Sequence, residues 1–521
     1  MIQFLLNDEM IELKSFAPSL SVLAWLRTNM GKVGSKEGCA SGDCGACTVV
    51  VGDLVDGKWH YKSINACLTL LGNCHGKHLI TVEALTTKIN PDIEDLHPVQ
   101  RAMVEYHGSQ CGFCTPGFIM SLFVLYMNYS TYPGKDIVIQ ALGGNLCRCT
   151  GYQPILKAAE HCFQYENDPE KNIAHEDHRF TKQVKVLTES LQTSLVTNQI
   201  PCIENDGQHF YLPQNLAQLC ELKTAYPQAK FVAGATDLSV EFSQQLTYQE
   251  QLISVRYCPE LMQFKNNESG LRIGAALPYS EFVESFCEIY PEAHELFDRL
   301  GSLQVRNAGS LGGSIANASP IGDPAPLLIA LNANLELQSS RGNRIIALED
   351  FFIGYRQTQL AEDEVIVTIH VPKREATLKL SCHKISKRIE DDISAVCLVL
   401  AYQYDDEKME QVRCAMGGMA ATPALAKHVA KSLNGKTLTL ENMQLAAEQI
   451  DVDFQPLSDV RASSAYRIQV SKNLFSRIWY QTQESINFQN NHFQNTQFKN
   501  ADVEITNAAP IIHTRVNHAA L

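Results

Sequence analysis

Eight cysteines within residues 1–150 form two groups whose spacing suits iron–sulfur chemistry. The first group follows the pattern C-x4-C-x2-C with a distant fourth cysteine, the arrangement of plant-type [2Fe–2S] proteins; its members are Cys39, Cys44, Cys47 and Cys67. The second group consists of two close pairs set among glycines, Cys111 with Cys114 and Cys147 with Cys149. Because one cluster takes four cysteine ligands, eight thiolates in two groups predict two iron–sulfur clusters.

Zinc is the alternative metal, since four cysteines also suit a tetrahedral Zn²⁺ ion. Structural zinc usually joins two close pairs, whereas the first group places three cysteines in one glycine-containing loop, residues 38–47, with the fourth far away. This spacing favours a ferredoxin-like cluster. The second group, C-x2-C followed by C-x-C, suits zinc about as readily as iron by spacing alone. A zinc-binding scaffold without a redox role therefore stays open.

The composition indicates a globular protein of several domains. The chain has 521 residues, of which 45% are hydrophobic and 19% charged, and this length can bury several cores. The net charge of −14 argues against a general nucleic-acid binder. We expect no membrane partner, because no apolar run approaches the roughly 18 residues of a bilayer span and the first residues lack signal-peptide features. A large chain rich in unpaired cysteines is typical of a reducing compartment, which predicts a cytoplasmic location.

The elements expected around the cysteines change in character along the chain. Residues 2–6 and 12–14 flank a turn and predict a hairpin, and residues 21–27 predict a helix that starts at a serine. From residue 85 the pattern is helical, with helices expected at 97–106 and 116–129 and another opened by Pro154. Helix N-termini near both pairs of the second group would offset the negative charge of a thiolate-ligated cluster.

Two stretches of small residues further along the chain could bind phosphate oxygens through free backbone amides. In the first, residues 230–238, an apolar strand breaks into a turn; the second is a loop over residues 306–324. Each alone is more often a packing turn, but together they could clamp a dinucleotide pyrophosphate from both sides. The GxGxxG motif is absent, so a Rossmann domain has no direct support.

The motifs around the second cysteine group, QCGFCTPG at residues 110–117 and CRCTGY at 147–152, resemble those of xanthine dehydrogenases and related molybdenum hydroxylases. The small-residue stretches follow in the order of that family's flavin domain, so the resemblance covers about residues 1–480 apart from a linker. It implies an α+β multidomain fold with these parts: a β-grasp plant-type ferredoxin domain (1–84), a four-helix-type [2Fe–2S] domain (85–165), a linker (166–200), an α+β FAD-binding domain of the vanillyl-alcohol-oxidase/CO-dehydrogenase flavoprotein type (201–375), a C-terminal α+β flavoprotein domain (376–485) and a polar tail (486–521). The resemblance does not explain the tail, which we expect to be partly disordered or to wrap a partner.

The resemblance also implies which residues bind cofactors. The eight cysteines would ligate two [2Fe–2S] clusters, and Gln110 and Cys149 would lie near a molybdopterin on a partner chain. The expected FAD contacts are Lys230, Phe231, Val232, Ala233, Gly234, Ala235, Thr236, Asp237, Leu238, Ser310, Gly313, Ser314, Asp323 and Ile366. Lys384 and Asp391 would lie near the flavin ring and Tyr355 where a nicotinamide dinucleotide docks. No hydroxylation base is expected on this chain.

The resemblance implies that the chain is the electron-transfer subunit of a xanthine dehydrogenase. Electrons would run from molybdenum on a separate large subunit through two [2Fe–2S] clusters to FAD and NAD⁺, while hypoxanthine and xanthine become urate. The expected assembly is a dimer of heterodimers. The main alternative is the equivalent subunit of an aldehyde or other N-heterocycle hydroxylase, because the substrate pocket would lie on the partner. O₂ remains an alternative acceptor, and the zinc scaffold remains the alternative of another class.

Overall fold

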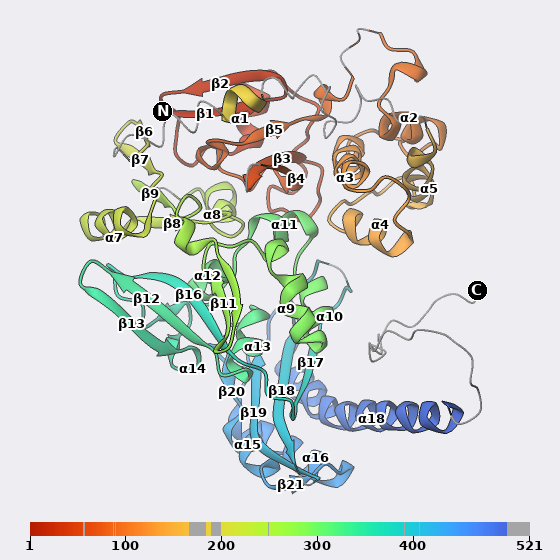
Figure 1. Cartoon of the computed structure of the whole chain (residues 1–521), viewed down its shortest axis with the longest axis vertical. Helices are drawn as coiled ribbons and strands as arrows, with labels where there is room; N and C mark the ends of the chain where they lie inside the picture. Colours follow the sequence, from red (N-terminus) through yellow and green to blue (C-terminus); the bar gives the residue numbers. More distant parts are fainter. Residues whose placement is uncertain are drawn as a thin grey trace.

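The computed structural model shows a series of α+β units that follow one another along the chain (Figure 1). It describes residues 1–55, 58–86, 88, 90–165, 184–188, 200–247, 249–389, 391–405 and 407–496. The linker expected at 166–200 therefore falls almost wholly outside the described residues. Within the described ranges, none of the helices combines the length and the apolar character that a bilayer span requires.

The first unit is a five-stranded sheet in the order β2-β1-β5-β3-β4, in which only β1 and β5 are parallel neighbours. Its strands are β1 (Ile2–Leu6), β2 (Glu9–Leu13), β3 (Thr48–Val55), β4 (Lys58–Asn65) and β5 (His78–Ile80). Helix α1 (Val22–Thr28) begins at Ser21, whose side chain accepts a hydrogen bond from the Ala24 N–H. Trp25 of α1 meets Phe4 edge to face, with ring centroids 5.4 Å apart. The sheet confirms the ferredoxin-like architecture predicted for this part of the chain.

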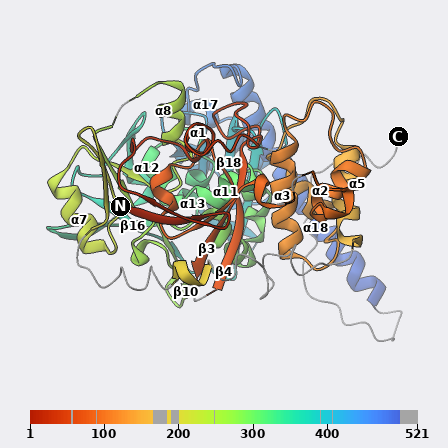
Figure 2. The same ribbon diagram turned by 90° about the horizontal axis from the view of Figure 1, so that it is seen from above.

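Four helices beside this sheet form the second unit, and both views place them to one side of it (Figures 1 and 2). They are α2 (Pro98–Glu105), α3 (Thr115–Asn128), α4 (Lys135–Leu142) and α5 (Gln153–His161). Proline stands in the first turn of α2, α3 and α5, where the missing N–H costs no hydrogen bond. Helix α3 is buried along most of its length, because it packs between the other helices and the ferredoxin-like sheet.

Residues 202–372 contain a four-stranded and a five-stranded sheet, besides the two-stranded sheet β14-β15 (Phe352–Gly354 and Gln357–Thr358). The smaller sheet has the order β6-β7-β9-β8, with β6 (Cys202–Asn205), β7 (Gln208–Tyr211), β8 (Lys230–Val232) and β9 (Gln251–Ser254), and with helices α7 (Leu216–Ala225) and α8 (Leu238–Gln244). The larger sheet is antiparallel, β10-β11-β16-β12-β13, with β10 (Phe264–Asn267), β11 (Gly270–Gly274), β12 (Asn334–Ser339), β13 (Gly342–Ala347) and β16 (Val365–Pro372). Phe210 and Leu252 of the smaller sheet share one buried core with Leu23 and Leu71. We call residues 202–372, which lie in the part of the chain predicted to bind FAD, the flavin-binding region. This region and the ferredoxin-like unit therefore fold against each other.

The connection from β11 to β12 is mostly helical, and short elements follow β13. These elements are α9 (Val283–Ile289), α10 (His294–Asp298), α11 (Leu303–Ala308), α12 (Leu311–Asn317), α13 (Pro324–Ala330), α14 (Leu348–Phe351), β14 (Phe352–Gly354) and β15 (Gln357–Thr358). Much of the stretch predicted as a loop, residues 306–324, is thus helix, and that prediction was wrong. The reason is serine capping, because the side chains of Ser302 and Ser310 accept hydrogen bonds from Val305 N–H and Gly313 N–H and start α11 and α12.

The last unit is a sheet of long strands with helices on one face. Its elements are β17 (Leu378–Ile385), β18 (Val396–Asp405), β19 (Lys408–Gly417), β20 (Ala424–Leu425), β21 (Lys436–Thr437), α15 (Lys427–Leu433), α16 (Leu440–Ala447), α17 (Ile450–Asp453) and α18 (Ser464–Thr496). One face packs on α15, α16 and α18, and the other shares a core with α13 and β12. Helix α18 runs past the boundary expected at residue 485 (Figure 1), so the first part of the expected tail is helical. Residues 497–521 lie outside the described residues.

Candidate iron–sulfur and flavin-binding site

The first cysteine group lies where β3 and β4 meet. Cys47 directly precedes β3 and Cys67 closely follows β4, and these strands are antiparallel neighbours. Their adjacent ends bring the two sulfur atoms to 3.3 Å. Cys39 and Cys44, in the loop before β3, contact each other through their side chains in the same way. Two adjacent pairs suit a [2Fe–2S] cluster, in which each iron takes two thiolates.

The second cysteine group is also arranged in pairs. Cys114 is the N-cap of α3 and contacts Cys147, which lies in the loop between α4 and α5. Cys111 contacts Cys149. Across the described ranges, no group of three or more His, Cys, Asp or Glu side chains could hold a single metal ion. The two sulfur pairs of each group suit a binuclear cluster, and two close cysteine pairs also suit a zinc ion.

Sulfur–sulfur contacts in the first group lower the pKa of one cysteine in each pair and raise the pKa of the other. The Ser41 N–H lies 3.4 Å from the sulfur of Cys39. Contact with the Cys44 thiol lowers the pKa of Cys39 to about 4, and the same contact raises the pKa of Cys44, because the two sulfurs share one proton. The thiolate is the form that ligates metal.

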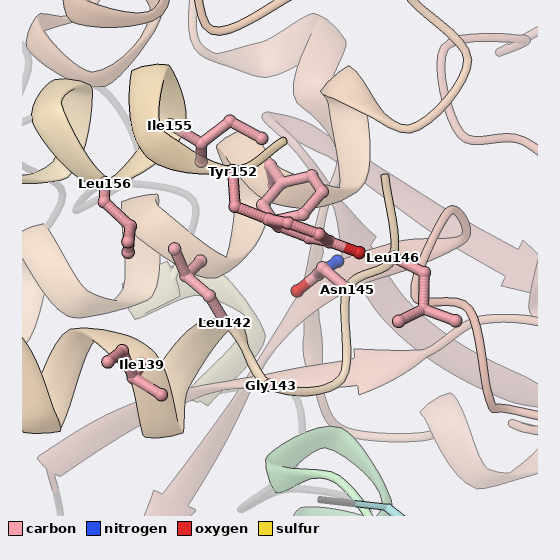
Figure 3. A pocket seen from close by; sticks show the side chains of 9 residues that line it. Ile139, Leu142, Gly143, Asn145, Leu146, Tyr152, Ile155 and Leu156 are labelled. Atoms are coloured by element: carbon pink, nitrogen blue, oxygen red, sulfur yellow. The ribbon is translucent and has the colours of Figure 1, made fainter. Parts of the chain in front are cut away.

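The two groups differ in their exposure. Cys111 and Cys149 are exposed, whereas Cys47 is 2% and Cys67 is 7% exposed. A pocket of about 220 Å³ lies beside the second group, lined mainly by apolar side chains of α4, α5 and the loop between them (Figure 3). Leu146 on this loop is 45% exposed. The second cluster site therefore has two cysteines at the surface of the chain, whereas the first has two buried cysteines, Cys47 and Cys67, and two partly exposed ones, Cys39 and Cys44.

A buried polar network joins both cysteine loops to the flavin-binding region. Asn145, two residues before Cys147, donates hydrogen bonds to the Gly45 carbonyl at 3.0 Å and to Thr48 Oγ1 at 3.2 Å. Its Oδ1 accepts hydrogen bonds from Ser121 at 2.7 Å and from Gln304 at 3.0 Å. Gln304 belongs to α11 and is completely buried. Asn145 thus links the helical unit to the ferredoxin-like unit and to the flavin-binding region. Neither Asn145 nor Gln304 was predicted from the sequence as a residue of the site.

The two cysteine loops also touch through their backbones. The Leu146 N–H donates a hydrogen bond to the Cys44 carbonyl at 3.0 Å. A Cβ on Gly117, in the first turn of α3, would lie 2.1 Å from the Gly45 carbonyl oxygen, so no larger residue fits there. The two cluster sites are therefore held at a fixed separation by direct contact.

The two segments predicted to bind FAD lie against each other. Gly234 follows β8, and a Cβ on this residue would come within 1.8 Å of the carbonyl oxygen of Ala308 at the end of α11. Only glycine allows this approach. Thr236 lies near Gly309, and Ser310 caps α12. The structure thus brings the backbones of both segments into contact.

The predicted FAD residues differ in what their side chains can do. Val232 and Ile366 lie in hydrophobic cores, and Phe231 packs beneath the Lys223 ammonium, 4.9 Å from the ring centroid. Ala235 and Ser310 are buried, Ala233, Thr236, Leu238 and Ser314 are partly exposed, and Lys230, Asp237 and Gly313 are exposed. A ligand between the two segments would therefore meet mainly backbone and small side chains.

Lys384 and Asp391, the two residues expected near the flavin ring, lie in different surroundings. Lys384 forms a buried ion pair with Asp323 at 2.7 Å, with side chains 2% and 4% exposed, and it also donates to the Arg299 carbonyl at 2.7 Å. Ser394 donates a second hydrogen bond to Asp323. Asp391 lies on a separate loop, where burial and the charge of Asp43 raise its pKa to about 6.

Two predicted contact residues lie at the surface. Tyr355 is 62% exposed, and Gln110 is exposed beside the second cysteine group. Their positions are accessible to a dinucleotide and to a partner chain, respectively.

Three family models match this chain in the order of its units. Residues 81–160 match a [2Fe-2S] binding domain, residues 204–374 the FAD binding domain in molybdopterin dehydrogenase, and residues 381–482 the CO dehydrogenase flavoprotein C-terminal domain. Together they match the helical unit, the flavin-binding region and the last unit of the structure.

Two relatives and one solved structure resemble this chain over different extents. The xanthine dehydrogenases of Blastobotrys adeninivorans and Emericella nidulans are 30% and 32% identical over 95% of this chain, and the alignments cover 42% and 40% of their own lengths. This chain thus spans less than half the length of these relatives. A carbon monoxide dehydrogenase structure from Hydrogenophaga pseudoflava superposes with a TM-score of 0.50 at 26% identity, covering 54% of this chain and 96% of that one.

Proposed function

We propose, on the premise that this chain is an iron–sulfur and FAD module of a molybdenum hydroxylase, that it is the electron-transfer subunit of a xanthine dehydrogenase. The premise rests on the family models and on homology to xanthine dehydrogenases over 95% of the chain. The proposal adds a molybdenum-bearing partner chain, hypoxanthine and xanthine as substrates, and NAD⁺ as the acceptor.

The observation that carries the proposal is the graded burial of the cysteine groups. Two cysteines of the second group, Cys111 and Cys149, are exposed and can meet a partner, while Cys47 and Cys67 of the first group belong to the core that continues into the flavin-binding region. The two groups touch through the Leu146–Cys44 hydrogen bond. An electron relay between a partner chain and a flavin needs this order, with the second cysteine group towards the partner and the first towards the flavin.

The residues of the chain fit the cofactors they would hold. Four thiols in two adjacent pairs suit each [2Fe–2S] cluster, and the touching segments around Gly234 and Ser310 suit a pyrophosphate. Bound flavin accepts electrons singly and releases them as a hydride pair, which couples one-electron clusters to NAD⁺. The chain itself buries Cys47 and Cys67 of the first cluster site in the core of the ferredoxin-like unit.

The apolar surface beside the second group supports a partner chain. Phe113 and Leu146 are 47% and 45% exposed, and the pocket of Figure 3 continues this surface. Apolar surface of this kind marks interaction sites. We propose that the molybdenum-bearing chain covers it, in a dimer of heterodimers. The seventeen free cysteines support a reducing, cytoplasmic location.

The test is an anaerobic titration of the purified chain with NADH, followed by flavin and iron–sulfur absorbance together. We expect both chromophores to bleach, with about four irons and one FAD per chain. Cofactors that NADH does not bleach would refute the NAD⁺-linked role and favour O₂ or another acceptor. A colourless protein that contains zinc would refute the relay itself.

The substrate is tested with the partner chain present. We expect reduction of the flavin by xanthine and hypoxanthine and not by an aldehyde. Reduction by an aldehyde or another N-heterocycle alone would identify the chain with the alternative hydroxylases.

A further inference from the structure

We propose that a small cavity between the ferredoxin-like unit and the flavin-binding region binds one monovalent inorganic anion of the size of chloride, and that this anion stabilises the contact between the two segments predicted to bind FAD. The cavity has a volume of about 40 Å³. The anion site goes beyond the proposed function, and only its effect on FAD rests on that function.

Charged side chains of both units line this cavity. Arg256, two residues after β9, comes from the flavin-binding region. The ferredoxin-like unit contributes Asp53 of β3, Lys62 of β4 and Lys77, which directly precedes β5. Asp53 forms ion pairs with both lysines, at 3.0 Å from Lys62 and in direct contact with Lys77. All four side chains are partly exposed, so a small ion from the solvent can reach them.

Arg256 is the cation of this cavity that lacks a carboxylate partner. In the part of the chain that the structure describes, no ion pair joins its guanidinium to an Asp or Glu side chain. It donates one hydrogen bond to the Ala308 carbonyl at 2.5 Å, and a guanidinium has further N–H groups to donate. Burial lowers the pKa of Arg256 and of Lys77, because removal from water disfavours the charged form. An anion beside these cations offsets that cost.

The charges and the volume together favour a monovalent anion. Glu281 pairs with Lys62 at 3.0 Å, so three cations, Lys62, Lys77 and Arg256, face two carboxylates, Asp53 and Glu281. One negative charge balances this set, whereas a dianion such as sulfate exceeds it. One water molecule needs about 10–15 Å³ of such a cavity, so the volume accommodates a chloride-sized ion.

The cavity also borders the two segments predicted to bind FAD. Gly234 and Ala308 both line it, at the point where the two segments meet. Asn73, another lining residue, donates a hydrogen bond to the Ala233 carbonyl at 2.8 Å. An anion that holds the Arg256 guanidinium in place therefore supports the Ala308 carbonyl where it contacts Gly234. Because coupling between two binding sites is reciprocal, we expect chloride and FAD to increase each other's affinity.

The direct test is chloride nuclear magnetic resonance of the full chain, in which exchange with a bound site broadens the line of free chloride. We expect broadening that saturates as chloride is added and that bromide reduces by competition. Arg256→Gln removes the charge but keeps a donor to Ala308, and it should weaken chloride binding about tenfold. The matched control is Arg272→Gln, because Arg272 pairs with Glu336 on the larger sheet; its broadening should equal that of the unmodified protein.

The effect on FAD is measured as the rate of FAD release after dilution, in chloride and in gluconate at the same ionic strength. We expect release about fivefold slower in chloride, both for the unmodified protein and for Arg272→Gln. For Arg256→Gln the two rates should be equal. A rate that does not depend on chloride in the unmodified protein would overturn the stabilising role of the anion.

If Arg256→Gln does not fold, Lys62→Gln removes a second cation of the cavity and should weaken chloride binding as well. Broadening that does not saturate, or that both folded variants retain at full strength, would overturn the anion site and leave the proposed function intact. Saturable chloride binding that depends on Arg256, in a chain that binds no FAD, would support the site and refute the proposed function.

Discussion

Replacing Lys384 by methionine should destabilise the protein strongly, because it leaves the Asp323 carboxylate charged and buried. The two side chains lie 2.7 Å apart and are 2% and 4% exposed. Removal of one partner from a buried ion pair typically costs about 3–5 kcal/mol. The hydrogen bond from Ser394 still stabilises the carboxylate, so we expect Lys384→Met to cost about 3 kcal/mol.

Replacing the other partner of the ion pair, Asp323, should lower the free energy of unfolding by a smaller amount. Asp323→Asn keeps an oxygen that accepts from Lys384, and the ammonium keeps its hydrogen bond to the Arg299 carbonyl at 2.7 Å. A residual cost of about 2 kcal/mol follows from the loss of the charge pair. The double variant buries no net charge, so its cost should be smaller than the sum of the two single costs by about 2 kcal/mol or more.

The assay is urea unfolding of protein with matched FAD content, evaluated at the first cooperative transition because a multidomain chain need not unfold in one step. The matched control is Lys472→Met, whose partners Glu448 and Asp451 have side chains 66% and 55% exposed; this change should cost less than about 1 kcal/mol. Additive costs of the two single substitutions would refute the reasoning, as would a Lys384→Met variant no less stable than Lys472→Met.

Three further predictions concern other parts of the chain. Gly234→Ala should abolish FAD retention, since its Cβ would lie 1.8 Å from the Ala308 carbonyl oxygen; FAD content after gel filtration is the measurement, and normal content contradicts the predicted site. Asn145→Asp should cost about 3 kcal/mol, because it turns a donor to Gly45 into a carboxylate, whereas the exposed Asn343→Asp should change the unfolding free energy by less than ~0.5 kcal/mol. Burial lowers the pKa of His383 to about 4, so the unfolded chain binds the extra proton first as the pH falls. The contribution of neutral His383 to the free energy of unfolding is therefore fully present above pH ~6.5 and should fall by roughly 3 kcal/mol towards pH 4. A His383→Leu variant whose unfolding free energy depends on pH in the same way would contradict this assignment.

The sequence predicted those local features that depend on residue types and spacings within a short segment. The C-x4-C-x2-C pattern, the serine at position 21 and the prolines that open α3 and α5 each act within a few residues of themselves. The ferredoxin-like sheet and the helical unit follow from such signals. The segment 306–324 was mispredicted because small residues suggested a loop, although Ser310 was available as a helix cap.

The contacts that assemble the site could not be predicted, because they join residues far apart in the sequence. Gln304 and Asn145 are separated by 159 positions, and Asp323 and Lys384 by 61. Nothing in the local sequence of a buried glutamine distinguishes it from an exposed one. The resemblance pointed to Asp323 and Lys384 as residues near the flavin, and only the structure shows that they pair with each other.

The packing of the chain fixes the relative positions of the cysteine groups and the flavin-binding region, whereas the surface beside the second cysteine group is exposed. Asn145 bonds to the first cysteine loop and to Gln304 of the flavin-binding region, and the ferredoxin-like unit shares a core with the smaller flavin-region sheet. A change in the separation of these units would break buried hydrogen bonds and expose apolar surface at once. The side chains of Phe113 and Leu146 are 47% and 45% exposed, and Leu146 binds the first cysteine loop through its backbone N–H. Substitutions of these side chains should alter assembly with a partner while leaving reduction of the isolated chain by NADH unchanged.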